Sequence, residues 1–281
     1  MKEDWDFFLT QVDGRPASIT VNLALRATAP LADRPKLLRF RLHLRLPGPE
    51  GLSTQEEFES LNLVEDQLVA ALKAEALFVG RSTYAGAREL FFYGSDPGVW
   101  ETRVAEVMKS FSEYRFEVAI SQDSAWTSYL EFLCPNREQA QSIENRRVCL
   151  ALQQHGDSLT EARPIDHFAY FDEEAARARF VARAKSRGFD HQLLPPTPGA
   201  STQFGVRLVR LDVPSFEGID AITLPLYREA LAEGGEYDGW GCPVPGQDKA
   251  ATPNDPTALK ALLLLFGLAL AILAFGWLTR K

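Results

Sequence analysis

Alternating apolar and polar residues predict that the first half of the chain mixes strands with helices. The clearest strand is Leu37–Leu46, in which leucines and Phe40 alternate with arginines and a histidine to give one apolar and one basic face. Before it, Trp5–Val12 and Ser18–Leu25 flank Asp13-Gly14-Arg15-Pro16, a pattern typical of a hairpin. The pattern then predicts a helix at 54–76 with Phe58, Leu61, Leu68 and Leu72 near one face, strands at 76–82 and 87–93, a helix at 97–111 and a strand at 114–122.

The second half repeats this order of elements without repeating the sequence. A helix at 136–154 leads into it. The pattern then predicts strands at 164–171, 189–194, 204–213 and 236–244, helices at 172–187 and 214–233, and a proline-rich loop at 195–199. Both halves therefore contain the series β-α-β-β-α-β. We predict an α+β protein with two tandem ferredoxin-like domains and a C-terminal transmembrane helix.

Changes in composition place the expected boundaries. We expect an N-terminal domain at 1–135, a connecting helix at 136–155, a second domain at 156–244, a linker at 245–257 and a transmembrane helix at 258–279. The linker is assigned because prolines and a glycine gather between the last strand and the apolar C-terminal segment.

The C-terminal segment predicts a membrane anchor. From Ala261 through Phe266 to Leu278 no residue is charged, and Trp277 stands near one end, where its ring suits a membrane interface. A helix of this length spans about 27 Å, close to the roughly 30 Å of a bilayer's hydrocarbon core. A buried core helix and an amphipathic surface helix are weaker alternatives, because the segment has no polar face.

Charge and cysteine content indicate a cytoplasmic location and protein partners. The N-terminus is acidic and lacks the apolar region of a signal peptide, so the bulk of the chain is expected in the cytoplasm. Three cysteines without metal or redox spacing fit a reducing compartment. The net charge of −8 argues against direct nucleic-acid binding and favours partners with basic segments.

Two short motifs raise the alternative of an enzyme. Gly156-Asp157-Ser158-Leu159 spells the nucleophile block of a lipase family, but no Asp-x-x-His follows it to supply a base. Asp166 and His167 form the other candidate, for a metal site. On a strand, however, His167 would share a face with apolar neighbours, as a core histidine does. The four histidines show no ligand spacing, and no cofactor fingerprint occurs, so no cofactor is expected.

The last predicted strand carries the strongest local signal for recognition. Its sequence is Glu236-Tyr237-Asp238-Gly239-Trp240-Gly241, preceded by two further glycines. Simple alternation would place Glu236, Asp238 and Trp240 on one face, and the glycines suggest a bulge or the close approach of another backbone. Trp240 is either a core plug or, with Glu236, Tyr237 and Asp238, part of an acidic, aromatic partner-binding surface.

These residues resemble the RraB (regulator of ribonuclease E activity B) family. The resemblance covers about 152–246 and extends upstream through Gly156-Asp157, Arg163-Pro164, Asp166-His167, Tyr170-Phe171 and Arg187-Gly188-Phe189. Residues 1–135 resemble a domain of unknown function often fused ahead of RraB-like domains, through Pro16-Ala17-Ser18-Ile19 and Val79-Gly80-Arg81-Ser82. The resemblance implies a protein without catalysis of its own that binds ribonuclease E and lowers its activity. The acidic tail of the founding protein is replaced by the linker and the predicted anchor.

Three hypotheses follow. The first is a membrane-tethered adaptor whose RraB-like half binds a basic segment of a protein partner such as a ribonuclease E-type enzyme. The second is a hydrolase or metal-dependent enzyme that uses Ser158 or the Asp166-His167 region. The third is RNA binding by a sheet, favoured locally by Arg39, Arg41 and Arg45 but opposed by the overall charge.

Overall fold

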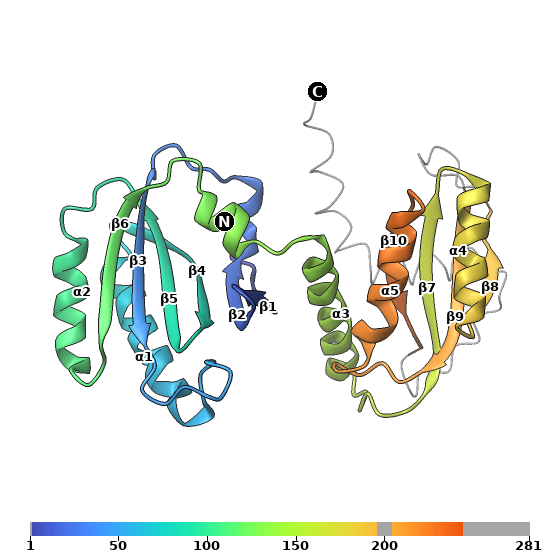
Figure 1. Ribbon diagram of the computed structural model, residues 1–281, viewed down its shortest axis with the longest axis horizontal. Coiled ribbons are helices and arrows are strands. Elements are labelled where there is room, and N and C mark those ends of the chain that lie inside the picture. The colour runs from blue at the N-terminus through green and yellow to red at the C-terminus, as the bar shows by residue number, and fades with distance from the viewer. Residues whose placement is uncertain (1, 196–203, 244–281) are drawn as a thin grey trace. The chain divides into compact units, whose positions relative to one another are not determined.

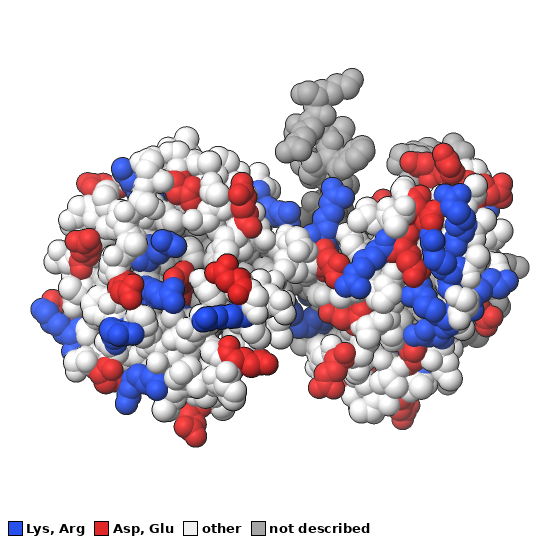
Figure 2. Space-filling model, in the orientation of Figure 1, with Lys and Arg blue, Asp and Glu red and all other residues white. Residues whose placement is uncertain are grey.

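Two compact units divide the chain, residues 1–144 and residues 145–281. The computed structural model describes residues 2–195 and 204–243 (Figure 1). The expected linker at 245–257 and the expected anchor at 258–279, with Ala261, Phe266, Trp277 and Leu278, lie outside these ranges. Within them, no helix combines the length and the apolar character needed to cross a membrane. Charges of both signs are interspersed over the visible surface of each unit (Figure 2).

The N-terminal unit is built on a six-stranded sheet with the order β1-β2-β4-β5-β3-β6. Its strands are β1 Trp5–Val12, β2 Arg15–Asn22, β3 Lys36–His43, β4 Ala76–Tyr84, β5 Ala87–Gly94 and β6 Phe116–Gln122. Its helices are α1 Gln55–Leu72 and α2 Trp100–Met108, with the short helical turns η1 Leu23–Ala27, η2 Lys109–Phe111 and η3 Ser128–Leu133. All neighbouring strands pair antiparallel. The β-α-β-β-α-β series is β3-α1-β4-β5-α2-β6, and the β1-β2 hairpin extends its sheet.

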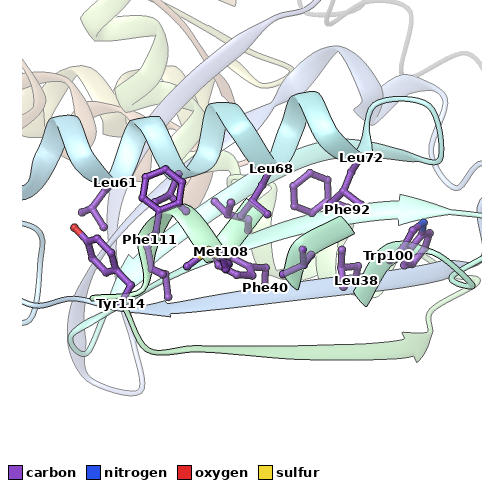
Figure 3. Close-up of a cluster of buried hydrophobic side chains, with 14 of the residues drawn as sticks. Leu38, Phe40, Leu61, Leu68, Leu72, Phe92, Trp100, Met108, Phe111 and Tyr114 are labelled. Atoms are coloured by element: carbon purple, nitrogen blue, oxygen red, sulfur yellow. The ribbon is translucent and has the colours of Figure 1, made fainter. Parts of the chain in front are cut away.

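Both faces of this sheet carry apolar clusters. Helices α1 and α2 cover one face, where Phe40, Phe92 and Trp100 are fully buried (Figure 3). On the other face, Tyr93 stacks on Trp126 with ring centroids 4.1 Å apart, in a cluster that includes residues of η3. One predicted core residue is misplaced: Phe58 of α1 is 40% exposed. Its neighbour Glu57 is buried instead, and its carboxylate accepts the backbone N–H groups of residues 45 and 46.

The C-terminal unit is a four-stranded antiparallel sheet with the order β10-β7-β9-β8. Its elements are β7 Arg163–Phe171, α4 Glu174–Ser186, β8 Asp190–Leu193, β9 Phe204–Asp212, α5 Ile219–Ala232 and β10 Glu236–Gly241. Helices α4 and α5 cover one face (Figure 1). The first and third strands of the series lie in the centre, which is the split β-α-β arrangement. The α+β class predicted from the sequence is confirmed.

Helix α3, Arg137–Gln154, was expected only to connect the domains. Its C-terminal half is instead part of the second core, because Cys149 and Leu152 pack in one cluster with Ile165, Ile219 and Trp240. Cys149 and Leu152 are three residues apart, so their side chains lie on the same face of α3.

Several predicted boundaries are wrong for local reasons. The strand expected at Ser18–Leu25 ends at Asn22, because the Asn22 side chain accepts the N–H of Ala24 and starts η1. The helix expected from Pro97 begins at Trp100, after a turn in which Asp96 accepts the N–H of Gly98. The helix expected from Pro214 begins at Ile219, after Ser215 accepts the N–H of Gly218.

Candidate partner-binding surface

A β-bulge in β10 decides which of the candidate residues reach the surface. Tyr237 pairs with Ala169 and Gly239 with Phe168, so Asp238 is an extra residue opposite no partner. Gly239 has a φ of +106°, a conformation that strongly favours glycine. The bulge shifts the alternation by one residue. Tyr237 and Trp240 are therefore both buried, and the simple alternation that grouped Trp240 with Glu236 and Asp238 is wrong.

Trp240 is held inside the unit by a network of buried polar groups. Its indole Nε1 donates a hydrogen bond of 3.0 Å to Oδ1 of Asn145 on α3. Asn145 in turn donates to Oγ1 of Thr223 over 2.6 Å and to Oδ1 of Asp220 over 2.7 Å. The side chain of Trp240 is only 2% exposed, so it acts as a core plug that joins β10 to α3 and α5.

Tyr237 and His167 form a second buried pair. The Tyr237 hydroxyl and Nδ1 of His167 share a hydrogen bond of 2.8 Å, and the His167 ring stands edge-on to Phe189. Burial, and then the positive charge of Arg210, lower the pKa of His167 to about 3. His167 is therefore a neutral core residue at physiological pH, as its place on the apolar face of β7 predicted.

Glu236 and Asp238 remain at the surface beside an aromatic ring. Glu236 is exposed and pairs in register with Tyr170 of β7, on the face of the sheet opposite α4 and α5. Asp238 is half-buried; burial, and then repulsion by Glu236, raise its pKa to about 6. Burial and the Asp238 charge also raise the pKa of Tyr170. We call Glu236, Asp238 and Tyr170 the acidic edge.

Glycines shape the acidic edge. A Cβ added to Gly205 would lie 3.0 Å from Cε1 of Tyr170, so the ring rests directly on the β9 backbone. A Cβ added to Gly235 would lie 2.3 Å from Phe171, so only glycine lets the chain enter β10 here. Tyr170 was not predicted as a site residue. Alternation along β7 could have found it, because it points away from the face that holds His167.

β10 is also an edge strand, at one end of the sheet order. Among the described residues, its outer side pairs with no other strand. Such an edge can accept a strand from another chain through main-chain hydrogen bonds. The acidic edge therefore combines two carboxylates, one aromatic ring and a pairing strand.

Among the described residues, the side chains around Ser158 do not form a pair of nucleophile and base. Ser158 is exposed and shares a 2.8 Å hydrogen bond with Thr160. The nearby imidazole of His155 contacts the carbonyl oxygen of Ala151, 2.7 Å from its Nδ1. Asp157 forms an ion pair with Arg163.

Asp166 and His167 do not lie together as metal ligands would. Asp166 pairs with Arg207 over 2.8 Å on one face of the sheet, while His167 lies buried on the other. In the described ranges, no group of three or more histidines, cysteines and acidic residues could hold a metal ion.

Comparison with known families identifies both units. Residues 142–242 match the family model described as "Regulator of ribonuclease activity B". Residues 142–242 form an RraB domain. Residues 3–134 match a family of unknown function, DUF695. Both resemblances inferred from the sequence are thereby confirmed. The RraB match starts inside α3, in keeping with the contribution of Asn145, Cys149 and Leu152 to the RraB core.

Comparison with solved structures adds no functional argument. An unknown protein from Galdieria sulphuraria is 10% identical, with a TM-score of 0.20, over 73% of this chain and 96% of that chain. A putative glycine cleavage system transcriptional repressor is 12% identical, with a TM-score of 0.21, over 74% of this chain and 98% of that chain. Scores this low do not establish a shared fold. None of the curated proteins matches the chain.

Proposed function

We propose that this protein is a non-catalytic, membrane-tethered adaptor whose RraB domain binds a basic segment of a protein partner and modulates ribonuclease E-type RNA degradation. The observation that carries the proposal is the RraB domain with an acidic edge on the sheet face opposite α4 and α5, which we call the open sheet face.

The electrostatics of the acidic edge favour a cationic ligand. Burial, and then the charge of Glu236, raise the pKa of Asp238, so the two ionised carboxylates repel each other. An arginine or lysine placed between them would relieve that repulsion, and its cation could also lie over the ring of Tyr170. Binding of this kind weakens as salt is added, because the charges are solvent-accessible.

The sequence after the RraB domain supports tethering. Residues 258–279 have the length and apolar character of a single membrane span. A cytoplasm-facing RraB domain held there would meet membrane-associated partners at raised effective concentration.

The test is a cleavage assay with a purified ribonuclease E-type enzyme and a fluorogenic RNA. We expect the full-length chain in detergent to bind the enzyme and lower the cleavage rate. Replacing both carboxylates (Glu236→Lys with Asp238→Lys) should abolish both effects, while the matched control Glu161→Lys with Asp190→Lys should retain them. The control residues are exposed in the same domain and give the same change in net charge.

Thermal melting shows whether the two double variants are folded. If the folded Glu236→Lys/Asp238→Lys variant still inhibits RNA cleavage, the acidic edge is not needed for inhibition. Absence of binding by the unmodified chain would remove the ribonuclease itself as the partner.

A further inference from the structure

The C-terminal half of α4 carries a basic ridge. Between Glu174 and Arg187 the chain has four arginines and one lysine against one glutamate. Arg177 is buried, and the other four cations, Arg179, Arg183, Lys185 and Arg187, are what we call the basic ridge. Figure 2 shows blue side chains gathered over α4.

The ridge has more positive charge than its neighbours neutralise. Arg179 and Arg183 both pair with Glu233, and Arg187 pairs with Glu229 over 2.6 Å. Two carboxylates thus face three arginines, and Lys185 adds a fourth cation, so the ridge has two more positive charges than its paired carboxylates neutralise. The side chains of Arg179 and Arg183 are 56% and 47% exposed, so their guanidinium groups can reach a further anion.

The length of chain between the RraB domain and the expected membrane span limits how far the basic ridge can lie from the bilayer. The described RraB domain ends at residue 243, and the expected membrane span begins at 258. Even fully extended, the 14 residues 244–257 between them would reach at most about 50 Å. A tethered RraB domain is therefore held within about 50 Å of the bilayer.

We propose that the basic ridge docks on anionic lipid headgroups, an inference that rests on the membrane anchor of the proposed function. Residues 152–246 carry a net charge of −5, which would repel an anionic surface as a whole. Screening limits this repulsion, because charges more than about 8–10 Å from the surface are hidden by physiological salt. The three arginines of the ridge lie on the side of α4 that faces α5, where they pair with Glu233 and Glu229. The acidic edge lies on the opposite face of the sheet.

The expected preference is large enough to orient the domain. Each lysine or arginine close to an anionic leaflet contributes about a fivefold factor to binding. An excess of two charges therefore gives a preference of about 25-fold for the ridge-down orientation. In that orientation the open sheet face, with Glu236 and Asp238, is turned away from the membrane and is accessible from the aqueous side.

The experiment measures energy transfer from the full-length chain to an acceptor dye on the lipid headgroups. Donor dyes are placed at Ala182→Cys on α4 or Leu211→Cys on the open sheet face, both exposed positions. The background carries Cys242→Ser, because the other two cysteines are buried. Vesicles contain phosphatidylcholine alone or with phosphatidylglycerol.

We expect higher transfer from position 182 than from position 211 in phosphatidylglycerol vesicles. The difference should shrink in high salt, in phosphatidylcholine alone and in Arg179→Gln/Arg183→Gln. The matched variant Arg15→Gln/Arg39→Gln, with two exposed arginines removed from the N-terminal unit, should keep it. A melting curve confirms that both variants fold.

The possible outcomes distinguish docking of the basic ridge from membrane anchoring by residues 258–279. Vesicle flotation with equal transfer at both positions overturns the ridge docking and leaves the anchor standing. Failure to float with either vesicle overturns both. Binding of poly(U) RNA in phosphatidylcholine vesicles, lost in Arg179→Gln/Arg183→Gln, would assign the ridge to RNA phosphates and overturn the lipid assignment.

Discussion

At the residue scale, Asp238 links stability to binding with opposite signs. Its pKa of about 6 lies above the ordinary value of 3.8, so its stabilising contribution is present at low pH and is lost as pH rises through about 6. Asp238→Asn should therefore stabilise the RraB domain at pH 7.5, by about 1 kcal/mol after allowance for solvent screening. The same change should weaken binding of a basic partner. Denaturant titration and binding at pH 7.5 test both signs, and a loss of stability would contradict the argument.

The pH dependence of partner binding follows from the same group. Below about pH 6 Asp238 gains a proton, and the acidic edge loses one of its two negative charges. We expect affinity to fall between pH 7 and pH 5, and we expect Asp238→Asn to flatten this dependence. A pH profile of the variant that matches the unmodified chain would assign the effect elsewhere.

His167 gives a separate stability prediction. Its pKa of about 3 lies below the ordinary histidine value of 6.5, so the unfolded chain binds the proton more readily. Stability is then lost as pH falls below about 6.5. Lowering the pH from 7.5 to 5.5 should cost the RraB domain about 1.4 kcal/mol through this group. Denaturant titration at the two pH values measures the loss, which His167→Gln should reduce.

At the element scale, the packing of β10 against α3 and α5 depends on Trp240. Trp240→Ala should cost roughly 3–5 kcal/mol, because it leaves a cavity and takes away the donor to buried Asn145. The effect should appear as an early melting transition of the RraB domain. Retention of the parent melting temperature would show that Trp240 is not the core plug.

Sequence patterns predicted the order of elements better than their details. The alternation in Leu37–Leu46 was enough to find β3, because one face of that strand is buried and the other is not. η3 was not predicted, because its residues cover the sheet through tertiary contacts that leave no periodic signature. The glycines of β10 suggested a bulge, but its position decides whether Trp240 or Asp238 is buried, and that depends on pairing with β7.

The sequence predicted only part of the candidate site, because the bulge and the strand register decide which side chains reach the surface. Glu236 and Asp238 were named because a core does not hold unpaired carboxylates, and the structure places both at the surface. Tyr237 was named with them, yet it lies inside, bonded to His167. Alternation along β7 places Tyr170 on the outer face, but its position beside Glu236 follows only from the register of β7 and β10.

At the scale of the whole molecule, the proposed anchor predicts how the chain fractionates. The full-length chain should sediment with membranes and resist alkaline carbonate extraction, because residues 261–278 are apolar throughout. A chain that ends at residue 243 should remain in the supernatant. Recovery of the full-length chain in the soluble fraction without detergent would exclude the anchor.

The β-bulge in β10 predicts the effect of deleting Asp238. Asp238 takes no part in the ladder, and Tyr237, Gly239 and Trp240 face consecutive residues of β7, from Ala169 back to His167. Removing Asp238 altogether should close the ladder into regular pairing, with both aromatic side chains still directed inward. The strand has thus accommodated one additional residue, whose carboxylate is displayed without disturbing the aromatic pair behind it. A shortened chain that folds but no longer binds would separate recognition from architecture at a single position.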